Sequence, residues 1–343
     1  MRSLCLPALF ILVLILPNFS HAGTDSTLTL CTWNLEHLAA RNDTGCRPRK
    51  NADYLALREY ADTLKADIIA FQEVENLTAA RRVFDPSKYK IELSNRPDVD
   101  LGRCRGRKRD RRMQRTGFAI RKNRLHQQGV TVSRLKDVRS LACRPSERWG
   151  VHITLQFDTV TATCKSAAGK VLHLLCVHLK SGCTYRTVAY RNDDSPCSRL
   201  AVQVPRLAAW MDAQAGVGED FIVLGDFNRQ LDQLGDAVWK ALDDSVICTW
   251  VRPASGMWHC RKGTARYNRI ADIERARAGR KHPYPHYPRH PYAVDHIVMS
   301  VGADWMAIEK TAEFIRDDKN LSDHTPLVIK LDTSRGIPPP KIR

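Results

Sequence analysis

Several features that would assign the chain to other protein classes are missing from its sequence. No segment repeats at a fixed period, so a repeat architecture is not expected. No CxxC pair occurs together with a matching pair of His or Cys, which argues against a structural zinc site. Apart from an N-terminal stretch, no apolar run approaches the length of a membrane span. These absences leave a globular chain whose 343 residues, 43% of them hydrophobic, suffice for one large α/β domain or two ordinary ones.

The N-terminal stretch has the order of features found in a secretory signal peptide. Arg2 precedes an apolar run from Leu4 to Leu16, and the small-residue sequence Ser20-His21-Ala22 follows. The run is short for a membrane span, so a retained N-terminal anchor is the weaker alternative. We therefore predict a signal peptide over residues 1–22, a mature chain without a transmembrane segment, and a secreted or periplasmic location.

Removal of the signal peptide takes away Cys5 and leaves ten cysteines, an even number in a chain that enters an oxidising compartment. Disulfides are therefore expected, although the sequence alone does not determine their pairing. Two pairs are spaced for local loop closure, Cys183 with Cys197 and Cys248 with Cys260. Cys31 and Cys176 lie inside strand-like runs and are predicted to be buried thiols.

Acidic residues are scarce, with 37 Asp and Glu against 54 Lys and Arg, so the formal net charge is +17. Losing Arg2 with the signal peptide lowers this by one, to +16. Such an excess favours polyanionic partners, either nucleic acid or an anionic membrane surface, over a general solubility effect. One short stretch concentrates the charge and contains a single acid: Arg103, Arg105, Arg107, Lys108, Arg109, Asp110, Arg111, Arg112 and Arg115. This run is predicted to be a solvated loop that binds phosphates.

The strongest local signal is the stretch Phe221 to Arg229. Four apolar residues, Phe221 to Leu224, indicate a buried strand, and Gly225 separates them from Asp226 and Asn228. Residues two apart on an extended chain point to the same side, so this acid and this amide are expected to face one site. Taken alone, the pattern is explained somewhat better by a strand that ends in an Asx turn.

Other strand-like runs also end in polar groups that can bind metal or transfer protons. The expected strands are Thr27–Trp33, Asp67–Phe71, Gly117–Arg121, Gly150–Phe157, Val171–Val177, Val294–Val298 and a last one opened by residues 321–327. Helices are expected over Asn51–Lys65 and Ser198–Met211, the second kinked by Pro205. The strand ends together supply Asn34, Glu73, His178, Asp226, Asn228, Asp295, Asp323 and His324. Oxygen ligands suit Mg²⁺, Mn²⁺ or Ca²⁺, and histidines paired with carboxylates suit proton transfer.

Six motifs in this order resemble the signatures of the endonuclease/exonuclease/phosphatase superfamily, typified by deoxyribonuclease I. They are Trp33-Asn34-Leu35, Gln72-Glu73-Val74, His178-Leu179-Lys180-Ser181-Gly182, Gly225-Asp226-Phe227-Asn228, Val294-Asp295-His296-Ile297 and Ser322-Asp323-His324-Thr325-Pro326-Leu327. The resemblance implies a four-layer α/β sandwich, in which two packed mixed β-sheets are flanked by helices. It also implies a single metal-dependent catalytic domain over residues 23–333, with basic insertions near 101–116 and 252–291 and a disordered tail over 334–343.

The resemblance also assigns roles by motif match. Glu73 would bind the catalytic Mg²⁺, Mn²⁺ or Ca²⁺ with help from Asn34, and Asp323 would supply a second metal contact. Asp226 and Asn228 would position the attacking water and the scissile phosphate.

Proton transfer would fall to the two histidines. His324, oriented by Asp295, would be the general base, and His178 would bind the phosphate and protonate the leaving oxygen. Arg148 is similar to an arginine that superfamily members often place ahead of the adjoining strand.

Two positions depart from deoxyribonuclease I. Gln114 stands where that enzyme has a glutamate that supports the acid histidine, which predicts a less basic His178. Glu75 stands where it has an arginine that contacts nucleic acid, so that contact is not carried over.

Three functions fit these patterns. The first is a secreted, monomeric nuclease whose Arg107, Lys108 and Arg109 grip DNA or RNA. The second is a phospholipid diesterase of the sphingomyelinase type, for which an exposed apolar hairpin is expected; the insertions are instead Arg-rich, although Tyr284, Tyr287 and Tyr292 keep this alternative open. The third is a catalytically dead nucleic-acid-binding protein, against which the retained carboxylates and histidines argue.

Overall fold

The computed structural model describes residues 26–157, 171–184, 188, 193–231, 236–242, 250–251, 259–260, 265–266, 293–308, 311–315 and 319–335. Several predictions concern residues outside these ranges: the signal peptide, most of the insertion at 252–291, the tail beyond 335, and the pairing of Cys248 with Cys260. Within the described ranges, no helix combines the length and the hydrophobicity that a membrane span needs.

Two six-stranded mixed sheets form the centre of the molecule. The first has the order β13-β14-β1-β2-β4-β3. Its strands are β1 (Thr27–Leu38), β2 (Ile68–Val74), β3 (Tyr89–Leu93), β4 (Arg115–Arg121), β13 (Glu313–Phe314) and β14 (Leu327–Asp332). The second has the order β11-β12-β8-β7-β6-β5. Its strands are β5 (Val130–Arg134), β6 (Val151–Phe157), β7 (Val171–His178), β8 (Asp220–Asp226), β11 (Ala265–Arg266) and β12 (Asp295–Ser300). A separate two-stranded sheet pairs β9 (Trp250–Val251) with β10 (His259–Cys260).

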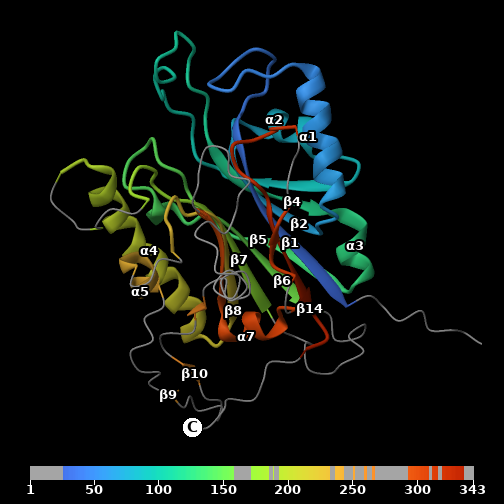
Figure 1. Ribbon diagram of the computed structural model, residues 1–343. Helices are drawn as coiled ribbons and strands as arrows, with labels where there is room; N and C mark the ends of the chain where they lie inside the picture. Colours follow the sequence, from blue (N-terminus) through green and yellow to red (C-terminus); the bar gives the residue numbers. More distant parts are fainter. Residues whose placement is uncertain are drawn as a thin grey trace, which may run out of the picture.

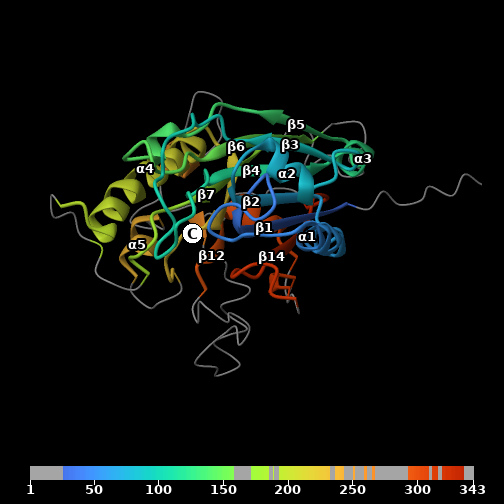
Figure 2. The ribbon, with the colours of Figure 1, turned by 90° about the horizontal axis from the view of Figure 1, so that it is seen from above.

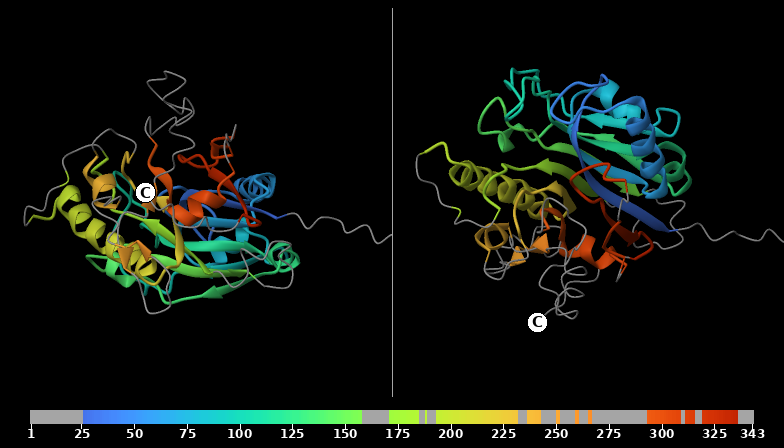
Figure 3. Two further views of the ribbon diagram at one scale, coloured as in Figure 1. Left: turned by 90° about the horizontal axis from the view of Figure 1, so that it is seen from below. Right: turned by 45° about the horizontal axis from the view of Figure 1, so that its top comes forward.

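Helices cover the outer faces of the two sheets. The described helices are α1 (Asn51–Thr63), α2 (Leu77–Val83), α3 (Lys122–Gln127), α4 (Pro196–Gly216), α5 (Ala237–Leu242), α7 (Val301–Met306) and the short 3₁₀ helix η1 (Arg139–Leu141). Figure 1 shows α1 and α2, in blue, on one side of the sheets and α4 and α5, in olive and gold, on the other. The views in Figures 2 and 3 show the sheets face to face between these helices. The predicted four-layer α/β sandwich is confirmed.

Three apolar clusters hold the layers together, and alternation along the strands explains them. Leu28 and Leu30 of β1 point into the cluster between the sheets, with Ile222 and Leu224 of β8. The intervening residues of β1, such as Cys31 and Trp33, pack under α1 and α2. A third cluster joins the outer face of the second sheet to α4 and α5. Because side chains alternate with a period of two, Asn34 and Asp226 continue the inward-facing rows beyond the apolar core.

Local backbone irregularities adjust the ends of these rows. The pairing of β1 with β2 shifts between Asn34 and Leu38, and that of β2 with β4 shifts between Phe71 and Val74. Glu73, inside the second shift, has a φ of 63°, a left-handed conformation that turns its side chain away from the regular alternation. Gly225 has a φ of 148°, and a Cβ there would lie 2.0 Å from the carbonyl oxygen of Val177. Only glycine therefore fits where β8 passes β7 next to Asp226.

The predicted strands are all present, but their ends differ by a few residues from the expectation. Helix α4 extends the expected helix at both ends: Ser195 caps it by accepting from the backbone N–H of Ser198, and it continues past Pro205 to Gly216. The helices α2, α3, α5 and α7 and the strands β3 and β5 were not predicted, because they are short and carry weak periodicity.

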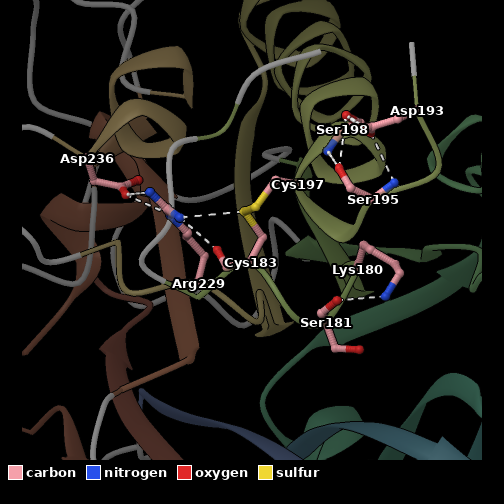
Figure 4. Close-up of a disulfide and its surroundings, with 9 residues drawn as sticks. All are labelled: Lys180, Ser181, Cys183, Asp193, Ser195, Cys197, Ser198, Arg229 and Asp236. Atoms are coloured by element: carbon pink, nitrogen blue, oxygen red, sulfur yellow. Dashed lines mark hydrogen bonds and ion pairs between the residues drawn. A yellow bond between two sulfur atoms is a disulfide. The ribbon is translucent and has the colours of Figure 1, made fainter. Parts of the chain in front are cut away.

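Two disulfides stabilise loops next to the sheet ends. Cys183 bonds to Cys197, as their spacing suggested, and joins the segment after β7 to α4 (Figure 4). Arg229 donates to the carbonyl oxygen of Cys183 (2.7 Å) and pairs with Asp236 (2.6 Å), so the segment after β8 is fastened to the same point. The second disulfide, between Cys46 and Cys104, was not predicted. Cys31 and Cys176 are buried thiols, as expected.

The Cys46–Cys104 disulfide should contribute more to stability than Cys183–Cys197. The two bonds close loops with sequence separations of 58 and 14 residues. In the chain-entropy description, loops of these lengths are worth about 4 and about 3 kcal/mol in the free energy of unfolding. We expect Cys46→Ser with Cys104→Ser to lower the thermal midpoint of the oxidised protein more than Cys183→Ser with Cys197→Ser. An unchanged midpoint in both double variants would contradict this role.

Candidate active site

The polar strand ends meet at one edge of the two sheets because of how their strands are paired. Strands β1 and β2 are parallel, as are β7 and β8, so Asn34 and Glu73 emerge together and His178 lies opposite Asp226 in the register. Strand β12 is antiparallel to β8 and begins with Asp295, also opposite Asp226. The segment that carries Asp323 and His324 enters β14, whose first residue pairs with β1.

Asp226 lies at the centre of the candidate site. Its Oδ2 accepts a hydrogen bond from Asn34 Nδ2 (3.0 Å), and its Oδ1 accepts from the backbone N–H of Asn228 (2.8 Å). His178 Nε2 and His324 Nε2 approach the same Oδ2, at 3.4 and 3.8 Å. Burial raises the pKa of Asp226 to about 7, with His324 opposing the rise and Asp295 adding to it. This carboxyl group is therefore protonated more readily than an exposed aspartate.

His324 is fixed on its other side by a buried carboxylate. Its Nδ1 lies 2.6 Å from Asp295 Oδ2, and its backbone N–H donates to Ser322 Oγ (3.2 Å). Ser322 Oγ in turn donates to the carbonyl oxygen of Asn34 (2.6 Å). Burial alone would lower the pKa of His324, but Asp295 and Asp226 outweigh it and hold the pKa well above the ordinary value.

Glu73 presents an ionised carboxylate on the other side of the site from His324 and Asp295. Its Oε2 accepts from the backbone N–H of His37 (2.9 Å), while Oε1 lies 3.8 Å from His178 Nε2 and 3.9 Å from Arg148 Nη2. Burial would raise the pKa of Glu73, but the nearby His37, His178 and Arg148 together lower it far below the ordinary value.

His178 is neutral in this arrangement. Arg148 Nη2 donates to His178 Nε2 (3.0 Å), so the imidazole proton belongs on Nδ1, which has no hydrogen-bond partner within the described part of the chain. Burial, followed by the charge of Arg148, lowers the pKa of His178 well below 6.5. The direction agrees with the low basicity expected from Gln114, but the cause is different, because Gln114 contacts Arg148 (3.2 Å) and reaches the histidine through it.

Three further residues at the site were not predicted to lie there. His37 contacts Glu73 and also Gln114, whose Nε2 lies 3.2 Å from His37 Nδ1. Arg111 Nη2 donates to Gln114 Oε1 (2.6 Å) and links the basic arm, defined as residues 101–116, to the site. Arg49 is buried and donates to the carbonyl oxygens of Leu35, Glu36 and Leu321, which ties the end of β1 to the segment before β14. The sequence marked Arg111 only as a member of the basic run, and no pattern marks His37 or Arg49.

The remaining predicted residues lie around this centre. Asp323 is partly exposed, 3.9 Å from His324 Nε2. Asn228 Nδ2 donates to the carbonyl oxygen of Leu179 (3.1 Å). Arg107, Lys108 and Arg109 are exposed on the basic arm, where Arg107 Nη1 donates to the carbonyl oxygen of Cys46 (2.9 Å). Figure 1 shows this arm, in teal, beside the blue loop that follows β1.

The donor groups fit a hard divalent cation. Asp226, Asp295 and His324 each offer a ligand atom within 4.8 Å of the others. Glu73 is not part of this group and offers a separate carboxylate, kept ionised by its surroundings, 3.8 Å from His178. Carboxylate oxygens are the ligands that Mg²⁺, Mn²⁺ and Ca²⁺ prefer. Asn34 fits less directly, since its Oδ1 accepts from the backbone N–H of Glu36 (3.0 Å) and its Nδ2 faces Asp226.

Comparison with known proteins places this site in a family. The sequence model of the endonuclease/exonuclease/phosphatase family matches residues 31–324, which include every strand end described above. The chain belongs to this family. This family comprises nucleases and phosphatases, so the chain has the fold of a hydrolase family.

Solved structures agree with the family assignment at the level of the fold. The human Nocturnin catalytic domain with bound sulfate is similar with a TM-score of 0.57 and 15% identity, over 89% of this chain and 94% of that one. Family members from Bacteroides vulgatus and Bacteroides thetaiotaomicron have TM-scores of 0.50, at 14% and 12% identity, over 89% of this chain and 98% and 97% of theirs. No curated protein sequence matches the chain significantly.

The charge state of His324 is open to direct measurement. In the metal-free protein we expect its imidazole to remain protonated above pH 6.5, because Asp295 and Asp226 stabilise the cation. Asp295→Asn removes one of these charges, so it should lower the pKa of His324. Histidine side-chain NMR over a pH series measures this, with the exposed His126 as internal reference. Identical His324 titrations in both proteins would contradict the assignment.

Proposed function

We propose that this protein is a divalent-metal-dependent phosphodiesterase that hydrolyses DNA or RNA outside the cytoplasm. One observation carries the proposal. His324 is bonded through Nδ1 to buried Asp295 and directs Nε2 at Asp226 Oδ2, 3.8 Å away. An imidazole oriented in this way by a carboxylate is the arrangement that a general base needs. The two disulfides support an oxidising compartment.

Water activation follows from the contacts of Asp226. This carboxylate is held by Asn34 and by the backbone of Asn228, so a water in front of it would lie between Asp226 and His324. His324 removes the proton from that water, and Asp295 stabilises the imidazolium that forms. Asp295 and Asp226 both favour the protonated imidazole. His324 therefore acts as a base once part of the negative charge of these two carboxylates is compensated.

Positive charge for the scissile phosphate comes from two sides. A divalent cation held by Glu73, with Asp323 as a second contact, would polarise the phosphate and offset the carboxylates. Arg148 supplies a buried guanidinium on the other side of Glu73, 3.9 Å from its Oε1. His178 accepts from Arg148 and orients it. If Arg148 turns to the phosphate, His178 Nε2 is free to take a proton from solvent and pass it to the leaving oxygen. Both sources stabilise negative charge in the transition state.

Charge distribution favours nucleic acid over lipid as the substrate. The basic arm carries exposed Arg105, Arg107, Lys108 and Arg109 beside the site. The large exposed apolar side chains of the described residues are scattered over separate elements and loops: Leu55, Leu77, Leu135, Val217 and Trp305. Membrane insertion would require a contiguous apolar surface.

The direct test is hydrolysis by the purified protein. Plasmid DNA, RNA and sphingomyelin are each incubated with Mg²⁺, Mn²⁺, Ca²⁺ or EDTA. We expect cleavage of nucleic acid that depends on a divalent cation and stops in EDTA. Cleavage of sphingomyelin alone would replace nucleic acid by phospholipid as the substrate, and cleavage of none would overturn the proposed activity.

Two substitutions separate catalysis from folding. His324→Ala and Asp226→Ala should each lower the rate constant by about 10²–10⁴, because they remove the base and the group that positions water. Far-ultraviolet circular dichroism should show an unchanged fold. His126→Ala, which changes an exposed histidine on α3, is the matched control. Wild-type turnover in either site variant would refute its assigned role.

The basic arm should govern the dependence of binding on salt. Each phosphate contact contributes about 0.9 to the slope of log affinity against log salt for duplex DNA and about 0.7 for single strands. Replacing Arg107, Lys108 and Arg109 by Gln should therefore flatten the slope and raise the Michaelis constant on long nucleic acid.

The matched control replaces three exposed lysines at the far end of the first sheet, Lys65, Lys122 and Lys330, by Gln. It removes the same formal charge away from the site. Equal salt slopes in both triple variants would show that the arm does not contact the substrate.

A further inference from the structure

Gln114 brings two arginines together next to the candidate active site. Its side-chain oxygen accepts from Arg111 Nη2 at 2.6 Å and from Arg148 Nη2 at 3.2 Å. Both distances end on Gln114 Oε1, so the Nη2 atoms of the two arginines can be no further apart than the sum of the two distances. Gln114 is itself buried, with 3% of its surface exposed, and its Nε2 lies 3.2 Å from His37. The amide is therefore held in a fixed orientation with its oxygen toward the arginines.

Acids compensate the two arginines only in part, although Asp226 and Glu147 act on Arg148 from further away than Glu73. Arg148 has Glu73 at 3.9 Å, a carboxylate assigned above to the metal. Arg111 forms no ion pair with any residue that the structure describes. Like charges this close repel each other, and the amide oxygen between them is neutral. A phosphate could bind both guanidinium groups with charge-assisted hydrogen bonds and remove the repulsion.

Neighbouring cations show that the surplus charge extends beyond this pair. Burial first, then the charges of Arg199 and Arg148, lower the pKa of Lys180 to about 8. Arg96 is buried, donates to the carbonyl oxygen of Ser146 (3.0 Å), and has its pKa lowered to about 10 by burial and by Arg148. Both groups are therefore close enough to Arg148 and Arg111 to feel their charge.

The residue type at position 114 decides whether Arg111 and Arg148 keep an excess of positive charge. A glutamate there, as in the deoxyribonuclease I motif, would pair with Arg111 and Arg148 and neutralise them. The amide keeps the same acceptor geometry but leaves the positive charge in place. The departure from the family motif thus has a consequence for substrate binding.

We propose that Arg111 and Arg148, held together by Gln114, form a second phosphate subsite that binds the phosphate adjacent to the scissile one. This proposal rests on the proposed phosphodiesterase function and specifies its substrate. The enzyme then prefers strands with at least two consecutive phosphates over isolated phosphodiesters. Arg148 lies between the two positions, since it also contacts His178 next to Asp226.

Short synthetic substrates test the subsite. Thymidine dinucleotides with one phosphodiester are compared with the same dinucleotides that carry an additional 5′- or 3′-phosphate. Contact with a charged group is worth enough to raise kcat/KM for one phosphorylated form by about tenfold to a hundredfold. Arg111→Gln should reduce this ratio to near one, whereas Arg81→Gln, an exposed arginine on α2, should leave it as in the wild type.

The variant Gln114→Glu distinguishes two roles of Gln114. This residue either leaves the arginines with the excess positive charge that binds phosphate, or it only holds the two guanidinium groups in place. If Gln114 only holds the two guanidinium groups in place, a glutamate does so at least as well and the ratio persists. If the surplus charge binds phosphate, the glutamate neutralises it and the ratio collapses with both arginines still present. A wild-type ratio in Gln114→Glu or in Arg111→Gln would overturn the proposal.

Calorimetry with inorganic pyrophosphate separates this proposal from the proposed activity. Binding that is weakened in Arg111→Gln and Gln114→Glu, without hydrolysis of any dinucleotide, would retain the subsite and refute the phosphodiesterase. Equal hydrolysis of dinucleotides with and without the extra phosphate, with pyrophosphate binding unaffected by the substitutions, would retain the phosphodiesterase and refute the subsite.

Discussion

The arrangement of the site depends on two buried carboxylates, Asp226 and Asp295. They lie at the end of the core between the sheets where the polar strand ends meet. Ionised carboxylates are unfavourable in such a place unless positive charge or hydrogen bonds compensate them. His324 lies between them, and their negative charges raise its pKa. His324 in turn opposes the rise that burial causes in the pKa of Asp226, which still reaches about 7. The protein alone leaves this compensation incomplete. A divalent cation would compensate the remaining negative charge of the two carboxylates. The chemistry of the site then follows from this shortage of positive charge.

The two-sheet fold makes this burial possible. Inward-facing positions of β1, β7, β8 and β12 are apolar along the core and become polar at one edge, so the site continues the core instead of lying on a surface loop. Both disulfides and Arg229 fasten segments at that edge to neighbouring elements. Side chains held by strands and by such ties lose little entropy when they bind a phosphate, and this pre-organisation is what catalysis by positioning requires.

The sequence predicted the strands and the groups at their ends because both follow from one rule. An apolar run of strand-forming residues buries itself, and a polar residue directly after it must lie at an edge. What it did not predict depends on contacts between distant segments. The left-handed backbone that turns Glu73 inward, the pairing of Cys46 with Cys104 and the carbonyl contacts of Arg49 have no local pattern. Short elements such as α2 and β5 were missed for the same reason, since packing and not periodicity fixes them.

Charge is divided across the site in a way that orients a substrate. Asp295 and Asp323 lie beside His324, Asp226 lies between the two histidines, and Arg148 contacts His178 on the other side. Glu73 lies between the two groups, within 3.9 Å of Arg148. In the proposed reaction, the cationic side would attract the negatively charged phosphate oxygens, and the anionic side, with its base, would be left to the attacking water. Reversing the substrate would place phosphate against three carboxylates. Gln114 strengthens this division because it adds an acceptor to the cationic side without adding negative charge, and a glutamate in its place would weaken the field that aligns the substrate.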